Sequence, residues 1–258
     1  MEGPSHATVE ACRGRETLLA VQDTSTIVFS HAVAEELGSV GEGEGNCVRG
    51  ILVHSTLMVD AQTREPIGLA DQQRWTRSDN TIKASHKKRS YQDKESIKWE
   101  QATEKMQARF ADVSNIVTVC DREADIYNYL TYLMDNEQRF VIRAAQNRRL
   151  QTRCGSLVEW MSKQRVVGLR RVELAQRGAQ RGSAKQKKRR TRPARTATLS
   201  IRTAEVELSL PANQRHGPLS LSVGVVYLRE KRPIKGEQRA EWILLTTEPL
   251  CSTDAIDR

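Results

Sequence analysis

The apolar positions in the first part of the chain fall into short runs that predict β-strands. The run from Leu18 to Val21 stops at Asp23, which predicts a buried strand with an acid at its end. The runs 51–59 and 66–70 are separated by a polar turn, and this arrangement predicts a hairpin of two further strands. Residues 1–17 have no clear period, so we expect a disordered lead-in before the first strand.

The next part of the chain alternates between helical and strand patterns. Apolar residues at helical spacing predict two helices, one carrying Trp99, Ala102, Met106 and Phe110 and one carrying Ile126, Tyr129, Leu130, Leu133 and Met134. Between them, the β-branched run 115–120 predicts a central parallel strand that ends at Asp121. Residues 140–142 predict one more strand.

This order of elements predicts the fold class: α/β, with a ribonuclease-H-like mixed sheet and flanking helices over residues 18–144. Alternating stretches separated by turn residues predict a β-rich insertion over 145–240, which contains a basic loop at 177–195. An apolar run begins at Trp242, and we interpret 241–258 as a truncated return strand of the core.

The charge of the chain is concentrated in the basic loop. The formal net charge is +9, and the loop holds nine Lys or Arg residues and no acid, so the rest of the chain is formally neutral. Such a cluster attracts a polyanion, of which DNA and RNA are the usual ones. The other interpretation is a solvated loop that needs no partner. The candidate DNA contacts in the loop are Lys185, Lys187, Lys188, Arg189 and Arg190.

Several classes of protein and site are disfavoured. No apolar stretch is long enough to cross a membrane and no secretory signal is present, so we expect a cytoplasmic protein without a membrane partner. The five cysteines are dispersed without a CxxC pair, which is typical of reduced thiols rather than a zinc site. Histidines without metal-ligand spacing are interpreted as surface or packing residues: His31, His54, His86 and His216.

Asp23 and Asp121 are the candidate catalytic and metal-binding residues, because each ends a strongly predicted strand. In the proposed sheet these strands are neighbours, and their carboxyl ends meet at the edge where open α/β folds place ligands. Two carboxylates there would hold Mg²⁺, an ion that prefers oxygen ligands, and paired metal ions support phosphodiester chemistry. The alternative is that each aspartate only caps a turn or helix, as Asp121 would for the helix that follows it.

The sequence also resembles a known family along most of its length. The segment Val117–Tyr127 (VTVCDREADIY) resembles the second-aspartate signature of the IS-four family of DDE transposases, and Leu19–Thr26 resembles its first-aspartate strand. Further similar segments follow in the same order: His31–Gly38, Val53–Leu57, Asp93–Ser96 with Lys98 and Trp99, Asn136–Arg143, Arg192–Arg195 and Glu241–Pro249.

The resemblance implies a role for each matching residue. Asp23 and Asp121 become the first two metal-binding acids, with Mg²⁺ or Mn²⁺ as cofactor. Trp242 becomes the aromatic residue that stacks near a base flipped out at the transposon end, and Arg143 becomes a contact to DNA phosphate. Without the resemblance, Trp242 is better interpreted as a core residue and Arg143 as a solvated strand end. Arg122 is interpreted as a supporting residue.

The resemblance further implies DNA cleavage and strand transfer at transposon ends, in the nucleoid of a bacterial cytoplasm. The family's third acid, a glutamate on a later helix, has no counterpart here, so we expect a fragment that is inactive alone. Its partners would be transposon-end DNA and a full-length transposase. Two alternatives remain open: a non-catalytic DNA-binding or transposition-interfering fragment, and a decayed reading frame.

Overall fold

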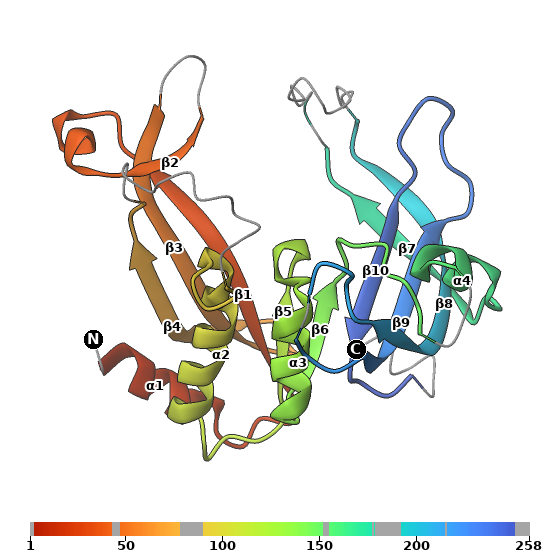
Figure 1. Ribbon diagram of the computed structural model, residues 1–258, viewed down its shortest axis with the longest axis horizontal. Coiled ribbons are helices and arrows are strands. Elements are labelled where there is room, and N and C mark those ends of the chain that lie inside the picture. The colour runs from red at the N-terminus through yellow and green to blue at the C-terminus, as the bar shows by residue number, and fades with distance from the viewer. Residues whose placement is uncertain are drawn as a thin grey trace. The chain divides into compact units, whose positions relative to one another are not determined.

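A computed structural model describes residues 3–42, 47–77, 90–151, 155–176, 178, 192–214 and 216–250. The chain divides into two compact units, Met1–Ala145 and Gln146–Arg258 (Figure 1). This boundary lies one residue from the one expected between the core and the insertion. Each unit is described by itself.

The first unit is built on a mixed sheet, which confirms the predicted α/β class (Figure 1). The strand order is β4-β3-β1-β5-β6, and β2 also pairs with β3. Strand β3 runs antiparallel to both β1 and β4, whereas β5 and β6 continue the sheet in parallel with β1. Their bounds are β1 Leu18–Val28, β2 Ser39–Glu42, β3 Cys47–Asp60, β4 Pro66–Trp75, β5 Ile116–Cys120 and β6 Arg139–Arg143.

The two predicted amphipathic helices are confirmed. Helix α2 spans Lys98–Arg109 and buries Trp99 and Met106, and helix α3 spans Tyr127–Asp135 and buries Tyr129. Helix α2 contacts α3, β3 and β4, so both helices pack over one face of the sheet. Short 3-10 turns precede each helix, η2 at Glu95–Ile97 and η3 at Arg122–Ala124, and a third, η1, spans Ala32–Glu36.

The expectation of a disordered lead-in is wrong. Residues Gly3–Cys12 form helix α1, which packs on β4 and fully buries Cys12. The buried side of α1 consists of small or weakly apolar residues such as Thr8, which explains why no hydrophobic period marks the helix in the sequence. The close approach requires a glycine, because a Cβ at Gly68 of β4 would lie 2.4 Å from Thr8 Oγ1.

Asp23 does not end a strand, contrary to the prediction. Strand β1 continues to Val28 because residues 24–28 pair with residues 50–54 of β3. Strand β3 likewise begins at Cys47, before its apolar run. The extension is mostly exposed and contains Thr, Ser, Ile and Val, residue types that form strands without a buried face. Burial marks only the first half of β1, and the apolar pattern therefore stops early.

The second unit is an antiparallel sheet of order β7-β8-β9-β10. Its strands are β7 Gly168–Leu174, β8 Arg195–Ser209, β9 Ser220–Glu230 and β10 Glu241–Thr246. The unit also has a helix that the sequence analysis missed, α4 at Leu157–Lys163, which begins with a capping box formed by Ser156 and Glu159. No helix among the described residues is long and apolar enough to span a membrane.

Candidate functional site

The register of the first sheet brings the two candidate aspartates together. Strands β1 and β5 are parallel neighbours, and Gln22 of β1 lies opposite Cys120 of β5. The next residue along each chain segment is Asp23 and Asp121, respectively. Since neighbouring strands lie about 4.8 Å apart, the two aspartates occupy adjacent positions at one place on the sheet.

The two aspartate side chains also share a face of the sheet. Gln22 and Cys120 are buried and bond to groups on helices α2 and α3, so they point to the helix-covered face. Asp121 keeps an extended backbone (φ −80°, ψ −170°), and successive residues of extended chain alternate between faces. Asp23 and Asp121 therefore point to the opposite face, where both are exposed. This is the arrangement that a shared cation requires.

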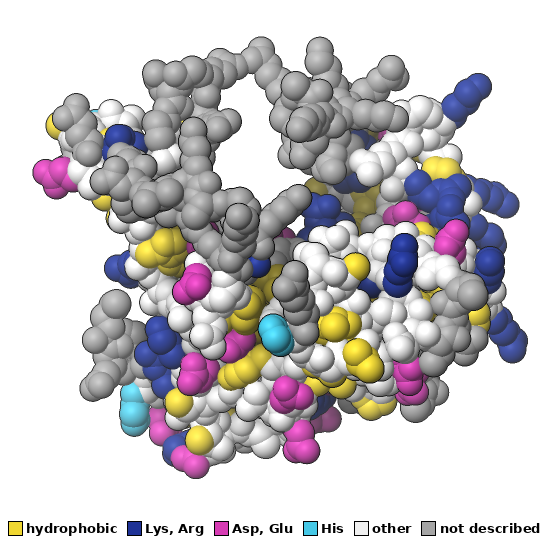
Figure 2. All heavy atoms as spheres, in the orientation of Figure 1, with side chains coloured by type: hydrophobic (Ala, Val, Ile, Leu, Met, Phe, Trp, Pro, Cys, Tyr) yellow, Lys and Arg dark blue, Asp and Glu magenta, His cyan; other side chains and the backbone are white. Residues whose placement is uncertain are grey.

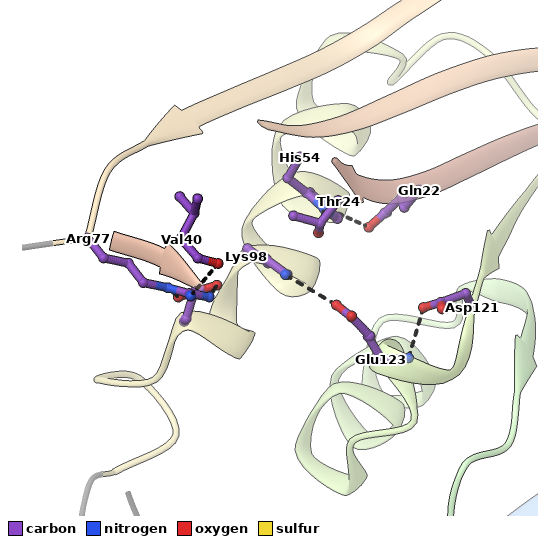
Figure 3. A network of polar contacts seen from close by, with 9 residues as sticks. Gln22, Thr24, Val40, His54, Arg77, Lys98, Asp121 and Glu123 are labelled. Carbon is purple, nitrogen blue, oxygen red and sulfur yellow. Dashed lines mark hydrogen bonds and ion pairs between the residues drawn. The ribbon is translucent and has the colours of Figure 1, made fainter. Parts of the chain in front are cut away.

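Asp121 also caps the N-terminus of η3, as the alternative interpretation of this aspartate expected. Its Oδ1 accepts a hydrogen bond of 2.8 Å from the backbone N–H of Glu123, at the start of η3 (Figure 3). The cap orients the carboxylate through one oxygen and leaves Oδ2 for a second role. Capping and metal binding are therefore compatible in Asp121.

Lys98 anchors the turn that holds Asp121. Its Nζ lies 3.7 Å from Glu123 Oε2 (Figure 3). The ammonium also lies 5.7 Å from the ring centroid of Trp75 and 5.4 Å from that of Trp99. The lysine is nearly buried, while Glu123 is largely exposed. Indole faces attract a cation at such distances. Lys98, the first residue of α2, therefore has favourable contacts with Trp75 of β4, Trp99 of α2 and Glu123 of η3. Trp99 is fully buried, as predicted for a core residue, and Trp75 is half-buried.

His54 of β3 is the main residue that sequence reasoning undervalued. It is buried, and its ring lies between Thr24 and Gln22, with Nδ1 2.9 Å from Thr24 Oγ1 and Nε2 3.3 Å from Gln22 Oε1 (Figure 3). Burial, together with the nearby Lys98 charge, lowers the pKa of His54 to about 4. His54 lies within an apolar run, and nothing in the sequence shows whether such a histidine only packs in the core or belongs to a network of hydrogen bonds.

Arg143, the candidate contact to DNA phosphate, lies at the end of β6, the strand next to β5. The side chain is half-buried. Burial and the neighbouring Arg122 guanidinium lower the pKa of Arg143, whereas the Asp121 carboxylate opposes this shift. The structure thus brings Arg143 and Arg122 into electrostatic range of Asp121, on the carboxyl side of the parallel strands.

The remaining candidates belong to the second unit. Trp242 lies in β10, half-buried against a cluster formed by Leu174, Ala197, Leu199 and Ala240, so it has the core contacts of the alternative interpretation. The other five candidate DNA contacts, Lys185, Lys187, Lys188, Arg189 and Arg190, lie outside the described residues. No family model matches the chain.

The donors at the paired aspartates suit a hard divalent cation. Both are carboxylates, exposed to water that would complete an octahedral shell around Mg²⁺. Among the described residues no cluster of three His, Cys, Asp or Glu side chains with metal-binding geometry occurs. Asp23 and Asp121 therefore fit an ion held by two protein carboxylates with water as the other ligands.

Proposed function

We propose that the chain is a portion of a cut-and-paste DNA transposase, with a ribonuclease-H-like core that carries two acids of a metal-dependent phosphodiester site. The observation that carries this proposal is the register in which Gln22 pairs with Cys120, so that Asp23 and Asp121 are neighbours on one face. The strand order β4-β3-β1-β5-β6, three antiparallel strands followed by two parallel ones, supports the ribonuclease-H-like core.

Each residue of the site has a role in this function. Asp23 and Asp121 would hold Mg²⁺ or Mn²⁺. A divalent ion held there would supply Lewis-acid chemistry for an in-line displacement at a phosphodiester. Arg143, near Asp121, would bind a DNA phosphate, since a guanidinium matches phosphate oxygens in two parallel hydrogen bonds.

The charge of the second unit supports DNA as the partner. Lys and Arg side chains are frequent on the surface of this unit in the view of Figure 2. Exposed cations among its described residues are Arg149, Lys163, Arg165, Arg171, Lys231, Arg232, Lys235 and Arg239. Contacts of this kind to phosphates release counterions and bind DNA without reading its sequence. Trp242 would add recognition of a flipped base, as the family resemblance implies.

Asp23 and Asp121 bear on metal binding directly and on strand transfer only through the bound metal. Activity is therefore a poor test of the function. A better test places Fe²⁺ at the carboxylates and uses ascorbate and peroxide to generate hydroxyl radicals there. These radicals cut DNA only within a short distance of the bound iron.

The experiment is run on an end-labelled duplex bound by the wild-type chain and by Asp23→Asn, Asp121→Asn and the double variant. We expect localised cuts with the wild type and loss of these cuts in all three variants, while duplex binding persists. Cuts that survive in the double variant would contradict the proposal. Duplex binding without localised cuts in the wild type would favour a non-catalytic DNA-binding protein instead.

A further inference from the structure

A chain of buried polar side chains runs beneath the paired aspartates, on the helix-covered face of the sheet. It begins at Thr24 and His54 and passes through Gln22 to Thr103 of α2 and Tyr129 of α3. Cys120, the residue before Asp121, lies at the far end with its Sγ 4.0 Å from Tyr129 Oη. The network therefore connects the residues on either side of Asp23 with the residue that precedes Asp121.

The donor and acceptor roles around Thr103 follow from the one proton that its hydroxyl can donate. The Thr103 hydroxyl donates its one proton to the carbonyl oxygen of Trp99 at 3.0 Å. It must therefore accept from its two other partners, the Gln22 amide at 2.9 Å and the Tyr129 hydroxyl at 2.8 Å. The Gln22 amide nitrogen faces Thr103, so its Oε1 faces His54.

The orientation of Gln22 fixes the tautomer of His54. An amide oxygen only accepts, so His54 Nε2 carries the proton and donates to Gln22 Oε1. His54 Nδ1 then accepts from the Thr24 hydroxyl. The neutral imidazole that this pattern requires agrees with the lowered pKa of His54. The ring is further fixed by an edge contact with Trp99, at 4.6 Å between centroids and 82° between planes.

The two residues that His54 joins, Gln22 and Thr24, flank Asp23 in β1. A side chain that bonds to both neighbours of a strand residue restrains the backbone at that residue, and so restrains the side chain on the other face. We propose that His54 is a positioning residue that holds the Asp23 carboxylate in place for a metal ion by clamping Gln22 and Thr24 from the buried face. This inference rests on the proposed function, since Asp23 has to be a metal ligand.

The test compares Mn²⁺ binding, followed by electron paramagnetic resonance of the free ion, in the wild type and in His54→Phe. Phenylalanine keeps the contact with Trp99 but has no group for Gln22 or Thr24. We expect Mn²⁺ to bind about tenfold more weakly, as is typical when a residue that orients a metal ligand is lost. Met58→Ala is the matched control, because it removes a fully buried side chain of β3 without touching the network.

A triple variant separates positioning from stability. Gln22→Met, Thr24→Val and His54→Phe together replace the local polar groups by apolar ones, so no buried acceptor is left unpaired between these three residues. We expect the thermal stability to return toward that of the wild type while Mn²⁺ binding stays weak. Full recovery of Mn²⁺ affinity in the triple variant, or unchanged affinity in His54→Phe, would overturn the role of His54.

Failure of the proposed function is distinguishable from failure of this inference. If the wild type binds no Mn²⁺, the metal site is wrong, and the clamp is then judged by amide hydrogen exchange in metal-free protein. A clamp predicts at least about tenfold faster exchange at residues 22–24 in His54→Phe than in Met58→Ala, since local opening rates report the loss of local restraints. Equal exchange in the two variants would overturn the clamp itself.

Discussion

At the scale of single residues, two polar side chains of the first unit, His54 and Lys98, are buried among defined partners. His54 stays neutral between a hydroxyl and an amide oxygen, while the Lys98 ammonium lies against two indole rings and Glu123. A buried histidine whose bonds require the neutral form is destabilised when it has to take up a proton. The stability of the fold is therefore linked to pH through His54.

The sign of this linkage follows from the two pKa values. The pKa of His54 is about 4 in the folded chain and 6.5 in its ordinary range, so the unfolded chain binds more protons between these values. The free energy of unfolding should fall as pH drops from 6.5 to about 4, by up to about 3 kcal/mol from His54 alone. Urea unfolding of the wild type and of His54→Phe across this range measures the effect.

The difference between the two proteins isolates His54. Asp60, Glu95 and Glu230 have lowered pKa values through hydrogen bonds or ion pairs, and both proteins lose these contributions alike in acid. We expect the stability advantage of the wild type over His54→Phe to shrink as the pH falls. A difference that stays constant from pH 7 to pH 4 would show that His54 does not titrate in this way.

At the scale of elements, helix α1 depends on one glycine of β4. A methyl group added at Gly68 would lie 2.4 Å from Thr8 Oγ1 and 3.1 Å from its methyl carbon, so Gly68→Ala should push α1 off the strand. The expected loss is about 1–3 kcal/mol, the usual cost of overpacking. Thermal unfolding of Gly68→Ala, Thr8→Ala and the double variant measures it.

The double variant provides the control for this contact. Removing the Thr8 hydroxyl and methyl clears the space that the new methyl needs, so Thr8→Ala should recover part of the loss caused by Gly68→Ala. Strictly additive effects of the two substitutions would mean that Gly68 is sensitive for a reason other than its contact with α1.

The elements also show how far the sequence predicts the fold. Helices α2 and α3 were predictable because each buries large apolar side chains at a regular spacing. Strand β5 was predictable from its β-branched run, and strand β6 from its apolar run at 140–142. Helix α1 was missed because Thr8 and Cys12 carry its buried face, and the end of β1 was missed because residues 24–28 pair through the backbone while their side chains are mostly exposed. Hydrophobic periodicity reports burial and not hydrogen bonding.

The candidate site was predictable only in part, for a similar reason. Two acids that follow predicted strands pointed to one sheet edge, and the register between β1 and β5 places them as neighbours. The polar network below them could not be predicted, because it joins residues far apart in sequence, such as Gln22 and Thr103, and needs the packed helices to exist. Lys98 and His54 lie in segments that resemble the family, but the resemblance assigns neither residue a role.

At the scale of the whole molecule, the proposed functions divide between the two units. Met1–Ala145 contains the two carboxylates, the polar network below them and Arg143. Gln146–Arg258 contains Trp242 and the basic loop. The proposed metal binding would use residues of the first unit. Binding of DNA would draw on both, with a salt dependence set by the cations of the second unit.

The central claim is that one divalent ion is shared by Asp23 and Asp121, and a double-mutant cycle on Mn²⁺ affinity tests it most directly. The wild type, Asp23→Asn, Asp121→Asn and the double variant are compared at fixed pH and salt by isothermal titration calorimetry. A shared ion predicts that each single substitution weakens binding by about tenfold or more, and that the double variant binds hardly more weakly than the weaker single variant. Mn²⁺ binding that is absent from the wild type, or that falls by independent, additive steps, would contradict the account.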